Sequence, residues 1–113
     1  YMMERLRHKR EEHFYVLLLT VKNKLIKPVL ISKGGLTSST AEQRAVFRQA
    51  IDANAAAMIL MHNHPSGDPT ESSDDVRVTK IFARAGEVMG IPVLDHIIIG
   101  DGMYVSLLEK GIL

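Results

Sequence analysis

The stretch AAAMILMHNHPSGDP, residues 55–69, decides the fold, because a strand, two histidines and a tight loop follow one another in it. The apolar run at residues 55–61 is short and uninterrupted, which is typical of a fully buried strand. His62 and His64 stand at its end, and side chains at positions i and i+2 face the same side of an extended chain. The sequence therefore predicts two imidazoles at the carboxyl end of a buried strand, where open α/β sheets usually bind ligands.

A carboxylate follows within the same short region. Ser72 could start a helix, and Asp75 then lies one turn into it, so the loop at residues 65–69 would carry Asp75 back toward the histidines. Two neutral imidazoles and one carboxylate form a ligand set suited to zinc, with a fourth position left for water. The spacing Ser72-x-x-Asp75 is also that of a helix capping box, which occurs at many helix starts for structural reasons. Both interpretations can hold together, because the first turn of a helix favours an anion.

These residues resemble a known family. His62, His64, Ser72 and Asp75 reproduce the signature of the JAMM (MPN+) metalloproteases, and residues 63–69 are similar to the bacterial RadC subgroup. Further similarities to RadC proteins follow in order along nearly the whole chain, at Glu12-x-Phe14, Gly34-x-Leu36-Thr37, Arg44-x-Val46-Phe47, Asn54 to Ala57, Asp95 to Gly100 and Tyr104-Val105-Ser106.

The resemblance implies a mechanism. His62, His64 and Asp75 would hold Zn²⁺, a bound water would complete the tetrahedron, and Glu12 would polarise that water as general base. Ser72 would donate a hydrogen bond to the oxyanion of the tetrahedral intermediate.

The assignment of the base to Glu12 depends on the resemblance. Glu11 is adjacent and Glu4 belongs to the same charged segment, but only Glu12 has the family's spacing to Phe14. Without the resemblance, Arg10 and the two glutamates that follow it would be read as a solvated helix end.

Three further polar residues have structural and functional interpretations. His96 follows Asp95 between apolar runs, and it is either a hydrogen-bond partner that orients a metal ligand or a satisfied core or edge histidine. His13 is expected to be structural. Asp68, between Gly67 and a proline, is expected to cap its own turn and not to bind the metal.

Composition indicates one small domain. The chain has 113 residues with 46% hydrophobic content, which is enough for one core, and the absence of cysteine leaves only nitrogen and oxygen as metal ligands. No apolar stretch is long enough to span a bilayer and no signal-like segment is present, so we expect a cytoplasmic protein with no membrane partner.

The basic residues cluster at the amino end, at Arg5, Arg7, Lys9 and Arg10, although the net charge is only +1. Such a segment could contact DNA phosphates but is more often solvated. We expect residues 1–12 to be a charged helix or linker remnant ahead of a RadC-type domain at 13–113. The resemblance implies a longer protein with a helix-hairpin-helix type DNA-binding segment before this domain, so the chain is expected to be a fragment.

The hydrophobic pattern predicts two helices, about 40–53 and 72–89. The first would open at Thr40-x-x-Gln43 and the second would stop at Gly90. Their buried faces would be Val46, Phe47, Ala50 and Ile51 in the first helix, and Val76, Ile81, Phe82 and Ala85 in the second. Strands are predicted at 14–19, 25–31, 55–61, 92–99 and 103–107, with hairpin turns at 22–24 and 100–102.

The predicted fold class is α/β (α+β), with a mixed β-sheet flanked by helices. The JAMM resemblance implies the same architecture, which is cytidine-deaminase-like.

The leading functional hypothesis is a zinc-dependent hydrolase of the JAMM type that cleaves a peptide or isopeptide-like amide in a peptide or protein substrate. The sequence identifies neither that substrate nor the oligomeric state. One alternative is a RadC protein associated with DNA repair or replication that acts on or near DNA, mainly through the amino-terminal segment. A second alternative is a metal-binding interaction module without turnover.

Overall fold

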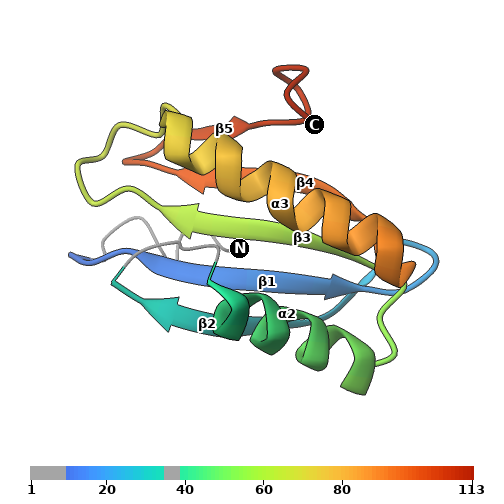
Figure 1. Ribbon diagram of the computed structural model, residues 1–113. Helices are drawn as coiled ribbons and strands as arrows, with labels where there is room; N and C mark the ends of the chain where they lie inside the picture. Colours follow the sequence, from blue (N-terminus) through green and yellow to red (C-terminus); the bar gives the residue numbers. More distant parts are fainter. Residues whose placement is uncertain (1–9, 35–38) are drawn as a thin grey trace.

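A mixed five-stranded sheet forms the centre of the molecule. The computed structural model describes residues 10–34 and 39–113 (Figure 1). The strands are β1 (His13–Leu19), β2 (Leu25–Lys33), β3 (Ala57–Asn63), β4 (Val93–Ile99) and β5 (Tyr104–Ser106). Their order is β2-β1-β3-β4-β5, and β3 and β4 are parallel while every other pair is antiparallel. The predicted α+β class is therefore confirmed, and the predicted strand bounds differ by at most two residues from those observed.

Two helices, α2 (Thr40–Asp52) and α3 (Ser73–Met89), lie across the same face of the sheet (Figure 1). Strand alternation sends every second side chain of β1 and β3 toward these helices. The resulting core contains Phe14, Val16, Leu18, Val46, Phe47, Ala50, Met58, Leu60, Val78 and Phe82. Among the described residues, no helix combines the length and the apolar composition that crossing a bilayer requires.

The predicted buried face of α2 is correct except at Ile51, whose side chain is 53% exposed. Val46, Ala50 and Phe47 span about 100° of the helix at 100° per residue, and Ile51 lies about 40° beyond that stripe. The N-cap of the helix is one residue earlier than predicted. Ser39, and not Thr40, accepts the Glu42 backbone N–H at 3.2 Å.

The predicted buried face of α3 is wrong at three of four positions. Val76, Ile81 and Ala85 are only partly buried, whereas the buried stripe consists of Asp75, Val78, Thr79, Phe82 and Gly86. Two of these residues are polar and one is glycine, so a hydrophobic pattern could not identify the stripe. The buried polar residues show that part of the contact between α3 and the sheet is hydrogen-bonded.

The predicted site residues lie at one end of the sheet. The carboxyl ends of β3 and β4, the start of β1 and the amino end of α3 all lie at the same side of the molecule (Figure 1). Helix α3 ends as predicted, at Gly90, which adopts a left-handed conformation with φ 73°.

Candidate metal centre

The pairing of β1 with β3 brings Glu12 to the histidines. Phe14 pairs with His62 in an antiparallel ladder, and continuing that register by two residues places Glu12 opposite His64. Alternation along the chain puts Glu12 on the same side as Phe14, which is the helix-covered side, and puts Glu11 on the other. The geometry of the sheet therefore distinguishes Glu12 from Glu11, which the local sequence could not do.

Side-chain atoms of three candidate ligands converge at the end of β3. The Nε2 atoms of His62 and His64 are 3.1 Å apart. Asp75 Oδ1 lies 3.4 Å from His62 Nε2, and Asp75 Oδ2 lies 3.1 Å from His64 Nε2. The His62 ring is almost fully buried, whereas the His64 side chain remains 15% exposed, so the group opens to solvent on the His64 side.

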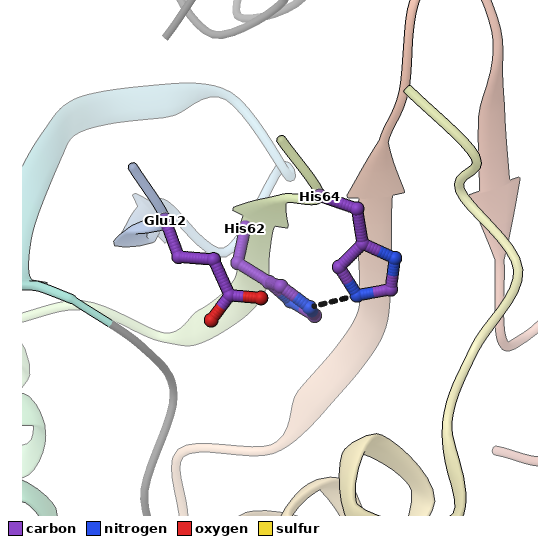
Figure 2. A group of neighbouring side chains, drawn as sticks. All are labelled: Glu12, His62 and His64. Atoms are coloured by element: carbon purple, nitrogen blue, oxygen red, sulfur yellow. Dashed lines mark hydrogen bonds between the residues drawn. The ribbon is translucent and has the colours of Figure 1, made fainter. Parts of the chain in front are cut away.

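A second carboxylate faces the same point. A carboxylate oxygen of Glu12 and a ring nitrogen from each of His62 and His64 all lie within 4.8 Å of one another. Figure 2 shows these three side chains side by side. The arrangement thus offers two imidazoles and two carboxylates in one half-buried group. A concentration of negative charge and ring nitrogens of this kind could hold a metal cation.

The spacing fits a tetrahedral ion. Zinc binds nitrogen and oxygen ligands at about 2.0–2.2 Å, and such bonds at tetrahedral angles place the ligand atoms about 3.3–3.6 Å apart. The His62–His64 and His64–Asp75 distances of 3.1 Å are slightly shorter than this, and the His62–Asp75 distance of 3.4 Å falls within it, with each histidine facing a different Asp75 oxygen. These nitrogen and oxygen atoms are therefore of the type that binds a metal cation, and they lie close enough together to share one ion.

The orientation of His64 is fixed by the loop that follows it. His64 Nδ1 lies 3.0 Å from the backbone oxygen of Asp68, and a carbonyl only accepts, so Nδ1 carries the hydrogen. In the neutral ring this leaves the Nε2 lone pair directed at the candidate site. The Asp68 side chain accepts the Thr70 N–H at 3.0 Å, which confirms its predicted role as a turn cap.

The loop itself is fastened to the end of β4. Gly67 O accepts the Asp101 N–H at 2.9 Å, and a Cβ placed at Gly100 would lie 2.3 Å from Gly67 O and 2.8 Å from the Pro69 ring. Only a residue without a side chain allows this approach. The position of the Asp68 carbonyl, and so of the His64 ring, depends on that close contact.

The orientation of His62 is fixed from inside the core. His62 Nδ1 lies 2.7 Å from His96 Nε2, and His96 is fully buried. Burial away from water, followed by the nearby His62, lowers the pKa of His96 to about 3, which keeps its imidazole neutral. Of the two interpretations of His96, this contact favours the one in which His96 orients a candidate metal ligand, here His62.

Asp75 is held as an anion by the helix start. Burial alone would disfavour the charged carboxylate, but the adjacent His62 ring and the hydrogen bond from the Ser72 N–H outweigh it and hold the pKa of Asp75 well below its usual range. Ser72 Oγ in turn accepts the Asp75 N–H at 3.0 Å, which completes the capping box. The capping interpretation is thus confirmed, and the cap also places Asp75 beside the histidines.

Asn63, buried between the two histidines, clamps the backbone on both sides of Glu12. Its Oδ1 accepts the His13 N–H at 2.6 Å and its Nδ2 donates to Glu11 O at 3.1 Å. Gly34 N–H also donates to Glu12 O at 2.8 Å. The sequence did not reveal this function of Asn63, because its partners are about fifty residues away.

The structure brings together all five residues that the sequence singled out: Glu12, His62, His64, Ser72 and Asp75. Sequence reasoning missed Asn63 and Thr79, which contact the group only through tertiary structure. Of the basic cluster proposed for DNA contact, Arg5, Arg7 and Lys9 lie outside the described residues, as does most of the predicted segment 1–12.

Known proteins resemble this chain over its whole length. Residues 1–112 match the family model described as "RadC-like JAB domain". A protein named UPF0758 protein from Pelobacter propionicus is 53% identical over 113 residues, which is 100% of this chain and 49% of that relative. A protein of the same name from Caldanaerobacter subterraneus is 54% identical over 110 residues, 97% of this chain and 47% of the relative. The chain therefore spans about half the length of the relatives it matches.

Proposed function

The chain belongs to the RadC-like JAB domain family, and on that premise we propose that it is a zinc-dependent hydrolase. The proposed reaction is the cleavage of a peptide or isopeptide-like amide in a peptide or protein substrate. His62, His64 and Asp75 would hold the metal, Glu12 would act as general base, and Ser72 would bind the oxyanion. When bound, zinc supplies a Lewis acid that polarises a carbonyl oxygen and lowers the pKa of water to about 7.

The observation that carries the proposal is the spacing of the ligand atoms. The two histidine Nε2 atoms are 3.1 Å apart, and each faces one oxygen of Asp75 at 3.4 Å and 3.1 Å, while the Glu12 carboxylate also lies beside them. We assign Asp75 as the third ligand because its carboxylate faces both imidazoles, which leaves Glu12 as the general base. A carboxylate that is not a metal ligand but lies next to a three-ligand site can act as the general base for hydrolysis.

Glu12 is positioned to move a proton. Its carboxylate would accept a proton from the attacking water and pass it to the leaving amine, and both transfers need the side chain held within hydrogen-bond reach. The Asn63 clamp and the Gly34 N–H fix the Glu12 backbone from three directions. Glu12 therefore needs no contact with the metal ligands to keep its place.

Ser72 has a hydrogen to donate. Its Oγ accepts the Asp75 N–H, so the hydroxyl hydrogen is not used in the cap, and the residue is exposed. A substrate carbonyl beside Asp75 could receive that hydrogen bond as negative charge develops on its oxygen, which is the moment when such a bond contributes most.

Zinc stoichiometry tests the metal centre. We expect about one zinc per chain after loosely bound metal is removed, by analogy with three-ligand catalytic zinc sites. His64→Ala and Asp75→Ala should lose the metal. Asp74→Ala is the matched control, because Asp74 is the neighbouring carboxylate and its side chain is 80% exposed. A wild-type protein that cannot be loaded with zinc would contradict the proposal.

Turnover separates the hydrolase from a metal-binding module. A library of internally quenched peptides and an isopeptide-linked analogue would be incubated with zinc-loaded protein. We expect cleavage that a chelator stops and that Glu12→Gln abolishes while zinc affinity stays nearly intact. Zinc binding without cleavage in the wild type would favour the interaction module. The hypothesis of action on DNA stays a prediction, because its basic residues lie mostly outside the described part of the chain.

A further inference from the structure

A row of buried hydrogen bonds runs from helix α3 to the proposed metal ligand His62. The Thr79 hydroxyl donates to the backbone oxygen of Asp75 at 2.6 Å. The same hydroxyl oxygen lies 2.5 Å from His96 Nδ1, and His96 Nε2 lies 2.7 Å from His62 Nδ1. The row therefore begins on one proposed ligand residue and ends on another.

The chemistry of the groups gives each bond a direction. The Thr79 hydroxyl has one hydrogen, which it donates to Asp75 O. His96 Nδ1 must then donate to Thr79 Oγ1, and in the neutral ring His96 Nε2 becomes an acceptor. His62 Nδ1 must in turn carry a hydrogen and donate to it. The remaining nitrogen of His62, Nε2, is left with a free lone pair that faces His64 and Asp75.

Burial prevents water from replacing the partners in these hydrogen bonds. Thr79 and His96 are fully buried and His62 is 1% exposed, so bulk water does not reach the bonds. His96 has hydrogen-bond contacts at its ring nitrogens with Thr79 and His62 and with no carboxylate, and an unpaired buried imidazolium would be costly. A neutral His96 with its hydrogen on Nδ1 satisfies every group in the row and keeps the hydrogen bond from Thr79 to Asp75 O.

We propose that Thr79 and His96 are positioning residues that hold His62 in the tautomer able to bind metal through Nε2. This inference rests on the proposed metal centre. Reversing the ring of His96 would make it donate to His62 Nδ1, which would place a hydrogen on His62 Nε2 and block coordination. Such a reversal would also turn the Thr79 hydroxyl hydrogen away from Asp75 O, because the hydroxyl would then donate to His96 Nδ1. Hydrogen bonds to the outer nitrogen of a ligand histidine commonly fix its tautomer and orientation.

Histidine tautomers can be read directly by nitrogen NMR of the imidazoles. In the zinc-loaded wild type we expect His62 to carry its hydrogen on Nδ1 and His96 to do the same. In Thr79→Val, which removes the hydroxyl and keeps the branched shape, we expect His96 to populate the form with the hydrogen on Nε2. Thr79→Ser restores the hydroxyl and should restore the wild-type tautomer. Finding the Nε2–H form of His96 in the wild type would overturn the proposal.

Zinc affinity, measured by competition with a chelator, gives a second readout. We expect Thr79→Val to weaken binding by roughly 10–100-fold, the usual cost of losing a group that supports a ligand, and Thr79→Ser to recover most of it. Val78→Ala is the matched control, because it opens a cavity at the adjacent buried position of α3 without touching the row. Equal affinities for wild type and Thr79→Val would overturn the proposal, as would an equal loss in Val78→Ala.

These outcomes are separable from those of the hydrolase proposal. A protein that binds zinc and loses zinc affinity in Thr79→Val, but cleaves no amide, would support the positioning role and contradict the hydrolase proposal. A protein that cleaves amides with Glu12 as base, while Thr79→Val binds zinc as well as wild type, would do the reverse.

Discussion

The two histidines of the candidate metal centre are two residues apart in sequence but are held by different parts of the molecule. His62 is buried, and its outer nitrogen contacts a side chain, His96, that is itself backed by Thr79. His64 is partly exposed, and its outer nitrogen donates to a backbone carbonyl of its own loop, at Asp68.

This difference predicts where each ligand is vulnerable. The support of His62 is made of side chains, so a single substitution in the core can remove it. The support of His64 is made of backbone, so substitutions of the loop side chains should matter little, and only a change that moves the loop should disturb it. The same proposed metal site would thus respond in two ways to mutation.

The largest effect is expected from His96→Phe, which keeps an aromatic ring but removes both nitrogens. We expect zinc affinity to fall by roughly 10–100-fold, because His62 loses the partner that orients it. Leaving the His62 Nδ1–H unsatisfied in the core should also cost on the order of 1–3 kcal/mol of folding free energy. Chelator competition and urea unfolding measure the two quantities. His13→Phe, at a buried histidine outside the row, should leave affinity unchanged; an equal loss there would contradict the special role of His96.

Gly100→Ala should disturb the other histidine. The added methyl group would meet Gly67 O and the Pro69 ring, so the loop must shift, at a cost on the order of 1–3 kcal/mol. The Asp68 carbonyl would move with it, and zinc affinity should fall in the same variant. Asp101→Ala keeps the backbone hydrogen bond to Gly67 and serves as the control. Full stability in Gly100→Ala would show that the loop is not held by this contact.

A smaller effect concerns pH. The pKa of Asp75 is lowered in the folded state, so its contribution to stability is fully present above the unfolded value of about 3.9 and is lost as pH falls below it. Urea unfolding of metal-free protein between neutral and acid pH should show this loss. Asp75→Asn should flatten the curve in the acid range, while Asp74→Asn, at an exposed position, should not. Parallel curves for wild type and Asp75→Asn would refute the assignment.

The smallest effect is expected from Asp68→Ala. The side chain caps the turn by accepting from Thr70, but the bond to His64 comes from the Asp68 backbone, which the substitution leaves in place. Zinc affinity should therefore change much less than in His96→Phe. A loss as large as that in His96→Phe would break the contrast between a side-chain support and a backbone support.

Much of the fold could be predicted from local patterns. The strands and helices were predicted to within two residues in nearly every case, because apolar alternation, glycine stops and capping spacings are local signals. The main error concerned which residues of α3 face the core. Asp75 and Thr79 are buried there by hydrogen bonds to partners on other elements, and hydropathy has no means of anticipating that.

The candidate site was predicted as a set of residues but not as an arrangement. His62, His64, Ser72 and Asp75 were identified by spacing, and Glu12 by resemblance alone. The antiparallel register of β1 and β3 is what selects Glu12 over Glu11, since one residue of shift exchanges the two faces of a strand.

The sequence by itself determined the types of the candidate ligands, the strand that carries the two histidines and the capped helix that carries the carboxylate, because these depend on residues close together in the chain. Only the tertiary structure decided what orients them. Asn63 reaches Glu11 and His13, and His96 reaches His62 and Thr79, across separations that local patterns do not encode. Hydrogen bonds between distant segments depend on register and packing, and these are properties of the whole fold.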